Sequence, residues 1–148
     1  MTIIRKIKKQ DIKQIESIYR NVSEFKCLDT DDFWANDELS AWVLNANDVC
    51  ICAVTESGVI IGYALTHIHI EVNKVHIENI FVEKEQRGKK IGKKLLQWIV
   101  QEYNNKFPKR EMRYVAMVNE NNKEALSYFK TQGFQNGEKM IWAQKYQK

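Results

Sequence analysis

Several features that mark specialised classes of protein are scarce or missing in this sequence. Its 148 residues include 1 proline, 6 glycines and 3 cysteines. No apolar run is long enough to cross a bilayer, and residues 1–6 lack the apolar core of a secretion signal. An odd number of cysteines without metal-ligand spacing argues against both a disulfide framework and a zinc site. We therefore expect a cytoplasmic protein that binds no metal and no membrane.

The features that are present are typical of a globular domain. Hydrophobic residues make up 44% and charged residues 28% of the chain, and a chain of this length can bury a substantial core. We find no internal repeat, low-complexity tract or linker, so residues 1–148 are expected to form a single domain. The net charge of +4 fits either an anionic ligand or a solvated surface. The positions of the lysines matter more than their sum.

Hydrophobic periodicity predicts a mixture of strands and helices. Alternating or continuous apolar runs predict strands, and apolar residues three or four positions apart predict helices. The expected strands span residues 2–8, 49–55, 59–70, 75–82 and 113–118, and the expected helices span residues 12–22, 33–43, 91–103 and 119–132. A final hairpin is expected over residues 134–146, around Asn136 and Gly137.

Polar residues and glycines mark the ends of these elements. Asp11 is expected to cap the first helix, and residues 29–32 the second. Residues 56–58 predict the turn of a hairpin, and Gly133 predicts a left-handed cap after the last helix. Because antiparallel hairpins are mixed with strand–helix units, the sequence predicts one α/β domain.

The most informative stretch is a charged, glycine-containing loop that connects a strand to a helix. The strand ends at residues 80–82, and the loop and the first helical turn follow at residues 87–93. Backbone N–H groups and the positive end of the helix dipole would meet there, which favours phosphate binding. The loop and the first helical turn carry four cationic side chains, Arg87, Lys89, Lys90 and Lys93. A nucleotide with a pyrophosphate is the expected ligand; the alternative is that Gly88 and Gly92 only shape a turn.

Two common nucleotide motifs do not fit this loop. Gly88 is not followed at the required spacing by Gly-Lys-Ser/Thr, so a P-loop is excluded. The Gly-x-Gly-x-x-Gly pattern of a Rossmann fold is also absent.

Three motifs, in order and in register, carry a family resemblance. Residues 87–92 (Arg-Gly-Lys-Lys-Ile-Gly) are similar to the acetyl-CoA loop Arg/Gln-x-x-Gly-x-Gly/Ala of the GNAT superfamily of N-acetyltransferases, with Lys90 in place of the usual first glycine. Residues 58–64 resemble that family's Gly-x-x-x-Gly-Tyr strand. Its Asn-x-x-Ala-x-x-x-Tyr-x-x-x-Gly-Phe segment is matched by Asn122, Ala125, Phe129, Gly133 and Phe134. The three motifs together cover roughly residues 49–134.

The resemblance implies a fold and a mode of cofactor binding. The fold would be a single α/β (α+β) domain, with a mixed, mostly antiparallel central sheet and about four flanking helices. The strand that ends Ile80-Phe81-Val82 would splay from residues 113–118, and the pantetheine of acetyl-CoA would bind the Ile80 and Val82 backbone in the gap. The acetyl group would lie near Ile80 and Phe81. The pyrophosphate would bind the backbone amides of Gly88, Lys89, Lys90, Ile91, Gly92 and Lys93, beside Arg87.

The chemistry of acetyl transfer requires a base, because an ammonium has no lone pair with which to attack. Glu78 is the candidate that we favour. Strand alternation would place it on the same face as Ile80, and relatives that resemble this sequence carry an acid there. His76 projects to that face too, at the position where another branch of the family has its catalytic glutamate. The alternative for Glu78 is an ordinary exposed strand carboxylate.

The acid that protonates the departing thiolate is left open. In relatives a tyrosine of the last helix has this role, and Phe129 occupies its position here. Tyr128 is adjacent, but one residue turns a helix by about 100°, so Tyr128 should point elsewhere. A water, Tyr128 after a helix offset, or no side chain at all would serve. Asn122 would face the thiol end of the cofactor.

Other candidates are weaker. Cys50 and Cys52 share a strand face and are expected to pack. His67 and His69 share another strand face and could line the acceptor pocket, but two histidines make a poor metal site. The acidic and aromatic side chains of residues 29–34 fall where relatives build the acceptor side, and would suit a cationic amine or simply cap and fill a helix.

The sequence thus predicts an acetyl-CoA-dependent N-acetyltransferase that transfers acetyl directly to a primary amine within a ternary complex. Its partners would be acetyl-CoA and an amine of a small molecule or protein, with a homodimer left open. One alternative is a non-catalytic domain that binds acyl-CoA, motivated by Lys90 and Phe129. Another is a nucleic-acid-binding module, but the lysines gather at one loop and no nucleic-acid motif is present.

Overall fold

The computed structural model describes residues 1–22 and 36–141 of the chain, and beyond them residues 143, 145 and 147. The chain divides into two compact units, Met1–Met117 and Val118–Lys148. The predicted cap and aromatic residues at 29–34 lie outside the described residues. None of the described helices is both long enough and apolar enough to span a membrane.

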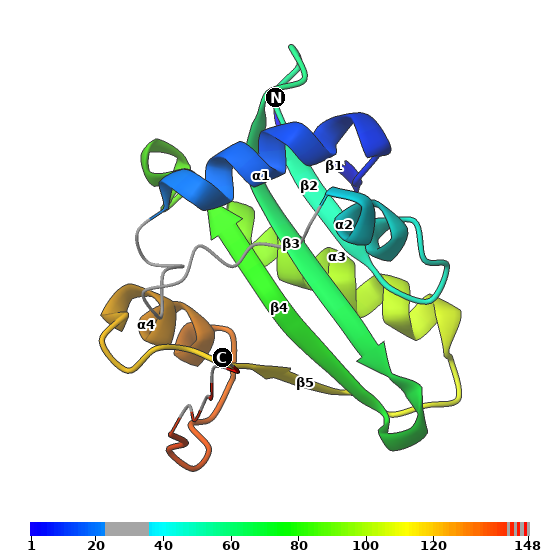
Figure 1. Ribbon diagram of the computed structural model, residues 1–148, viewed down its shortest axis with the longest axis vertical. Coiled ribbons are helices and arrows are strands. Elements are labelled where there is room, and N and C mark those ends of the chain that lie inside the picture. The colour runs from blue at the N-terminus through cyan, green and yellow to red at the C-terminus, as the bar shows by residue number, and fades with distance from the viewer. Residues whose placement is uncertain (23–35, 142, 144, 146, 148) are drawn as a thin grey trace. The chain divides into compact units, whose positions relative to one another are not determined.

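A five-stranded sheet forms the centre of the first unit (Figure 1). Its strands lie in chain order, β1-β2-β3-β4-β5, and the first four are antiparallel while β4 and β5 are parallel. The strands are β1 (Ile3–Lys6), β2 (Cys50–Val54), β3 (Ile60–His69), β4 (Lys74–Val82) and β5 (Arg113–Ala116). The predicted mixed, mostly antiparallel sheet is confirmed.

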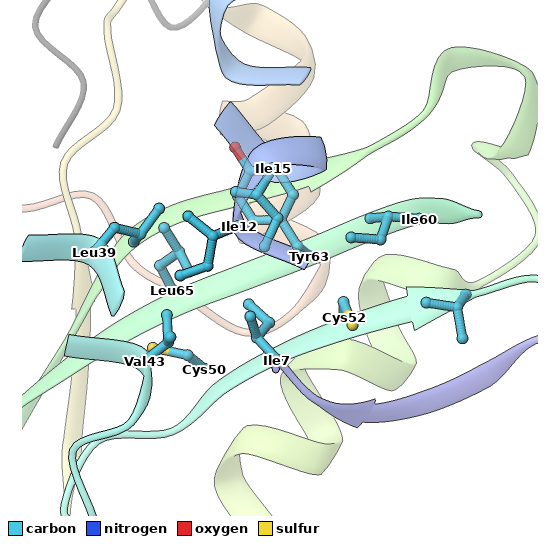
Figure 2. Close-up of a cluster of buried hydrophobic side chains, with 11 residues drawn as sticks. Ile7, Ile12, Ile15, Leu39, Val43, Cys50, Cys52, Ile60, Tyr63 and Leu65 are labelled. Atoms are coloured by element: carbon cyan, nitrogen blue, oxygen red, sulfur yellow. The ribbon is translucent and has the colours of Figure 1, made fainter. Parts of the chain in front are cut away.

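Helices cover both faces of this sheet. The helices α1 (Ile12–Asn21) and α2 (Asn36–Val43) lie on one face, and α3 (Ile91–Lys106) lies on the other (Figure 1). One core cluster packs α1 and α2 against the sheet, with residues such as Ile15, Leu39 and Tyr63 (Figure 2). The second cluster packs α3 against the sheet through residues such as Leu95 and Ile99. The membership of a side chain in one or other cluster therefore tells which face of the sheet it lies on.

The start of α1 differs from the sequence-based expectation. Asp11 lies at the N-cap position of α1, but its side chain makes no capping hydrogen bond to that helix. Its carboxylate accepts instead from the Lys8 backbone N–H at 2.7 Å and from the Arg5 guanidinium at 2.7 and 3.0 Å. Because the short 3₁₀ turn Lys9–Asp11 precedes the helix, the carboxylate stabilises that turn and ties it to β1.

The second unit contains the helix α4 (Lys123–Thr131). Gly133 follows it with a φ of +90°, as expected of a left-handed residue after a helix. The predicted final hairpin is wrong for the described part of that segment, since residues 134–141 form no strand. A two-stranded hairpin is only marginally stable unless it packs on another surface, and the exposed Met140 and Ile141 have no such packing.

Gly62 allows α3 to approach the sheet closely. A Cβ atom at this position would lie 2.9 Å from the Phe81 carbonyl oxygen and 3.5 Å from side-chain atoms of Ile91 and Leu95. Since Ile91 and Leu95 belong to the first turns of α3, the missing side chain sets the position of that helix relative to the end of β4.

We expect Gly62→Ala to destabilise the protein by about 1–3 kcal/mol, because overpacking displaces a strand backbone that cannot move as a side-chain tip does. Chemical denaturation measures the change. Gly137→Ala is the matched control, because a Cβ there meets nothing within 4 Å, and its effect should stay within about 0.5 kcal/mol. Equal stability of the two variants would show that Gly62 is not needed for this close approach.

Candidate active site

The strand β4 extends past the end of β5. Their parallel pairing runs from Lys74↔Arg113 to Ile77↔Ala116 and ends there, while β4 continues to Val82. The end of β4 therefore has β3 on one side but no β5 partner on the other. The absence of β5 pairing beyond Ile77 is what the predicted splay of this strand requires.

The backbone groups of Ile80 and Val82 point to this open edge. The Glu83 N–H donates to the Ile61 carbonyl at 2.9 Å, which sets the alternation of the antiparallel ladder between β3 and β4. By that alternation Phe81 bonds to β3, and Ile80 and Val82 face away from it. The Val82 carbonyl accepts at 2.9 Å from Nε of Arg87. The open edge can hold an extended, amide-containing ligand as a strand holds its neighbour.

A β-bulge at Glu78 corrects one expectation about this strand. Leu65 pairs with Asn79 and Thr66 pairs with Ile77, so Glu78 is an extra residue in β4. Ile80 packs in the cluster on the α3 face. Glu78 does not lie on the α3 face. Its carboxylate contacts His76. His76 follows Val75, which packs in the α3 cluster, so strand alternation places His76 on the opposite face. The prediction that Glu78 and His76 share a face with Ile80 is wrong, since an extra residue reverses the alternation.

Glu78 and His76 form a close pair on the α1/α2 face. The Glu78 Oε1 and the His76 Nδ1 lie 2.8 Å apart, and the side chains are 27% and 19% exposed. Both groups are therefore partly shielded but still reachable from solvent. A carboxylate beside an imidazole in this setting can take a proton from a cationic group that enters beside it.

Thr66 is held in place next to the bulge by several hydrogen bonds. It is fully buried, and its hydroxyl donates to the Val49 carbonyl at 2.6 Å and bonds with the Tyr103 hydroxyl at 2.7 Å. The Thr66 carbonyl accepts from Nε1 of Trp42 at 3.0 Å. Because Thr66 pairs with Ile77 directly before the bulge, these bonds fix the backbone that positions Glu78.

The loop between β4 and α3 aims its backbone at the same end of β4. Gly88 and Lys90 have positive φ angles, +79° and +63°, and α3 begins at Ile91. The first turn of a helix leaves N–H groups without intrahelical acceptors, here those of Ile91 and Lys93. Lys89, Lys90 and Lys93 are exposed around this turn. Exposed lysines thus surround the start of α3, and phosphate binding there stays a prediction.

Lys90 adopts the backbone conformation that a glycine would adopt freely. Its φ of 63° and ψ of 15° are left-handed, which costs an L-residue with a Cβ about 1–2 kcal/mol. We expect Lys90→Gly to raise the free energy of unfolding by up to about 1 kcal/mol. The relief of backbone strain is partly offset because glycine is more flexible in the unfolded chain. Thermal or chemical denaturation tests this. Lys89→Gly removes the same charge where φ is not positive, and should be slightly destabilising; a loss of stability in both variants would contradict the strain at Lys90.

The second unit holds the remaining predicted residues. Asn122 is the N-cap of α4, and its Oδ1 accepts from the Ala125 N–H at 3.1 Å. Phe129 is buried and stacks edge-on with Phe134, with ring centroids 5.0 Å apart. Burial raises the pKa of Tyr128 to about 12, so Tyr128 is a weaker acid than an exposed tyrosine. The roles of these residues toward a cofactor stay predictions.

The weaker candidates have structural partners. His67 is 46% exposed, and its Nδ1 lies 3.1 Å from Oδ2 of the buried Asp48. His69 packs edge-on against His67, with ring centroids 4.9 Å apart. Cys50 and Cys52 are buried free thiols. In the part of the chain that the structure describes, no three His, Cys, Asp or Glu side chains are placed to hold a metal ion.

One residue of the site was missed by sequence reasoning. Asn79 pairs with Leu65 and directly follows the extra residue Glu78, and its side-chain Oδ1 is buried without a hydrogen-bond partner. An alternating strand would have placed Asn79 and Glu78 on opposite faces. Only a sequence signal for the bulge could have brought Asn79 into the site, and we find none in residues 74–82.

Comparisons with known proteins agree with this geometry. The model of the acetyltransferase (GNAT) family matches residues 10–134. No curated protein sequence matches the chain significantly.

Among solved structures, several acetyltransferases are similar in fold. A GNAT-family acetyltransferase from Staphylococcus aureus Mu50 has a TM-score of 0.80 at 18% identity, covering 93% of this chain and 87% of its own. The PaiA N-acetyltransferase from Thermoplasma acidophilum, in complex with coenzyme A, has a TM-score of 0.80 at 18% identity, covering 95% and 93%. The acetyltransferase AAC(6')-Iy, bound to the bisubstrate analogue CoA-S-monomethyl-acetylneamine, has a TM-score of 0.74 at 21% identity, covering 99% of each chain.

Proposed function

The chain belongs to the acetyltransferase (GNAT) family, and from this premise we propose that it is an acetyl-CoA-dependent N-acetyltransferase acting on a primary amine. The similar structures include complexes with coenzyme A, with acetyl-CoA and with a bisubstrate analogue of an aminoglycoside. These ligands belong to those proteins. For this chain the proposal rests on its own site.

The open edge of β4 beside the start of α3 is the observation that carries the proposal. Pantetheine contains two amide groups in an extended arm, which match the outward backbone of Ile80 and Val82 as a neighbouring strand would. The pyrophosphate would then bind the loop and helix start at residues 88–93, where N–H groups and lysines converge. One ligand that combines both groups accounts for both features.

Glu78 is the proposed base of the reaction. Its carboxylate takes one proton from the acceptor ammonium, and the freed nitrogen lone pair forms a C–N bond to the thioester carbonyl carbon. The C–S bond then breaks and the thiolate leaves. The nitrogen loses its second proton, and the thiolate gains one. The products are an N-acetyl amide, coenzyme A and one proton, so atoms and charge balance. The His76 Nδ1 lies 2.8 Å from the Glu78 Oε1, close enough to orient the carboxylate.

Direct transfer fits the state of the described cysteines. Burial raises the pKa of Cys50 to about 12 and that of Cys52 to about 11. The nucleophilic form of cysteine is the thiolate, so neither side chain is available to form a covalent acetyl-enzyme near neutral pH. We therefore propose a ternary complex in which the amine attacks acetyl-CoA itself.

A second candidate function follows from Phe129. A phenyl ring stands where the family has its tyrosine acid, and a phenyl ring donates no proton. A domain that binds acyl-CoA without turnover would tolerate this residue. The proposed function instead expects the thiolate to be protonated by water or to leave without assistance.

The release of free thiol from acetyl-CoA tests which function holds. The purified protein would be incubated with acetyl-CoA and separately with spermidine, kanamycin, L-lysine and a tetrapeptide with a free N-terminus. We expect thiol release above the acceptor-free rate for at least one amine, with the N-acetylated product found by mass spectrometry. Tight binding of acetyl-CoA without acetylation of any acceptor would instead support the non-catalytic domain.

A further inference from the structure

We infer that Asn79 is a second residue that binds the acceptor amine, through its side-chain carbonyl beside Glu78. This inference rests on the proposed function and extends it. The Oδ1 atom of Asn79 is buried and has no hydrogen-bond partner. Buried polar atoms in native proteins are nearly always paired, so an exception calls for an explanation such as a ligand that is not present.

The register of β4 places Asn79 and Glu78 on the same face. Asn79 pairs with Leu65 and Phe81 pairs with Tyr63, without a shift between them. Phe81, Leu65 and Tyr63 all pack with the cluster under α1 and α2, so Asn79 lies on that face too. Glu78 lies there with His76. The bulge therefore brings two consecutive side chains to one side of the sheet.

The chemistry of the pair selects an ammonium. A side-chain carbonyl and an ionised carboxylate only accept hydrogen bonds, so their shared ligand must be a donor. A primary ammonium has three N–H groups and a positive charge, and can serve both acceptors at once. After Glu78 has taken one proton, the neutral amine still has N–H groups. Asn79 would keep one of them and so orient the lone pair.

This arrangement distinguishes the acceptor class within the proposed function. An alcohol has one O–H and cannot serve both acceptors. A secondary amine has fewer N–H groups to share once it is neutral. The inference therefore commits to a primary amine that enters as its ammonium.

Asn79→Leu tests the inference because it keeps the approximate shape of the side chain and removes the acceptor. The free enzyme should lose no thermal stability, since the deleted oxygen had no partner. For each amine of the panel that wild type acetylates, the KM should rise at least tenfold, about 1.4 kcal/mol. The dissociation constant of acetyl-CoA, measured by calorimetry, should not change. Asn79→Ala is the second variant if Asn79→Leu does not fold.

Tyr63→Phe is the matched control. The Tyr63 hydroxyl is another buried polar atom on this face that has no hydrogen-bond partner. Figure 2 shows it beside α1 in the hydrophobic cluster, so it should not reach a substrate. This variant should also keep its stability, and its KM for the amine should equal that of wild type.

Three outcomes would overturn the inference. An unchanged amine KM in a folded Asn79 variant, with normal wild-type turnover, would refute the role of Asn79 alone. A loss of stability with an unchanged KM would assign Asn79 a structural partner. Absence of wild-type turnover with every amine of the panel would refute the proposed function, and the inference with it.

Discussion

Glu78→Gln is expected to lower turnover by about 10²-fold or more, because it preserves the size of the side chain and removes the base that frees the amine lone pair. Acetyl-CoA binding should barely change, since the proposed cofactor contacts are made by the backbone of β4 and by the loop before α3. The loss should be partly reversed at high pH, where more of the acceptor amine is already neutral. Steady-state rates from pH 6 to pH 10 measure both effects.

His76→Gln is the control for Glu78→Gln. The His76 Nδ1 lies 2.8 Å from the Glu78 carboxylate, but His76 is not the proposed base. Its removal should therefore change turnover far less than removal of the carboxylate does. The opposite ranking at neutral pH, with Glu78→Gln near normal and His76→Gln inactive, would make His76 the base.

Gly92→Glu is expected to weaken acetyl-CoA binding at least tenfold, about 1.4 kcal/mol. Gly92 lies in the first turn of α3, where the pyrophosphate would bind. A carboxylate at this position repels the phosphates and fills the space that they need. Calorimetric titration of the folded variant with acetyl-CoA measures the loss.

Gln97→Glu provides the matched control for charge. Gln97 is exposed on the same helix, so the variant adds a carboxylate to α3 without placing it at the helix start. Its affinity for acetyl-CoA should stay close to that of wild type. Undiminished affinity in a folded Gly92→Glu variant would exclude the loop as the pyrophosphate site.

The elements that the sequence predicted best are those whose local and tertiary signals agree. The strands at residues 50–54, 60–69, 74–82 and 113–116 lie within or close to the predicted runs. The continuous apolar run at residues 50–54 reflects burial of the sheet under helices on both faces. The helix Ile91–Lys106 was predicted from one apolar face, and that face packs on the sheet.

The errors arose where tertiary contacts override local pattern. Alternation placed Glu78 beside Ile80, but the bulge reversed the phase for all residues before it. The residue types at positions 76–80 do not indicate a bulge. Asp11 was assigned to the wrong hydrogen bonds because the partner that holds it, Arg5, lies on β1. The turn residues Asn136 and Gly137 predicted a hairpin whose described residues form no strand.

Lys90 shows the opposite case, in which the residue type departs from the expected pattern and the backbone conformation does not. The side chain departs from the glycine of the GNAT pattern, yet the backbone is left-handed, a conformation that glycine adopts freely. The motif therefore predicted the backbone conformation at this position even though the residue there is not the expected glycine. The structure gives Asn122 a capping contact and Phe129 a packing contact within their own unit, and their roles toward a cofactor stay predictions.

The initial-velocity pattern with acetyl-CoA and an accepted amine tests the central claim most directly. Rates would be measured over a grid of both concentrations and plotted in double-reciprocal form. Direct transfer in a ternary complex predicts lines that intersect. Parallel lines, together with an acetylated enzyme seen by intact-protein mass spectrometry before the amine is added, would contradict the account, because the acetyl group would then pass through the protein itself.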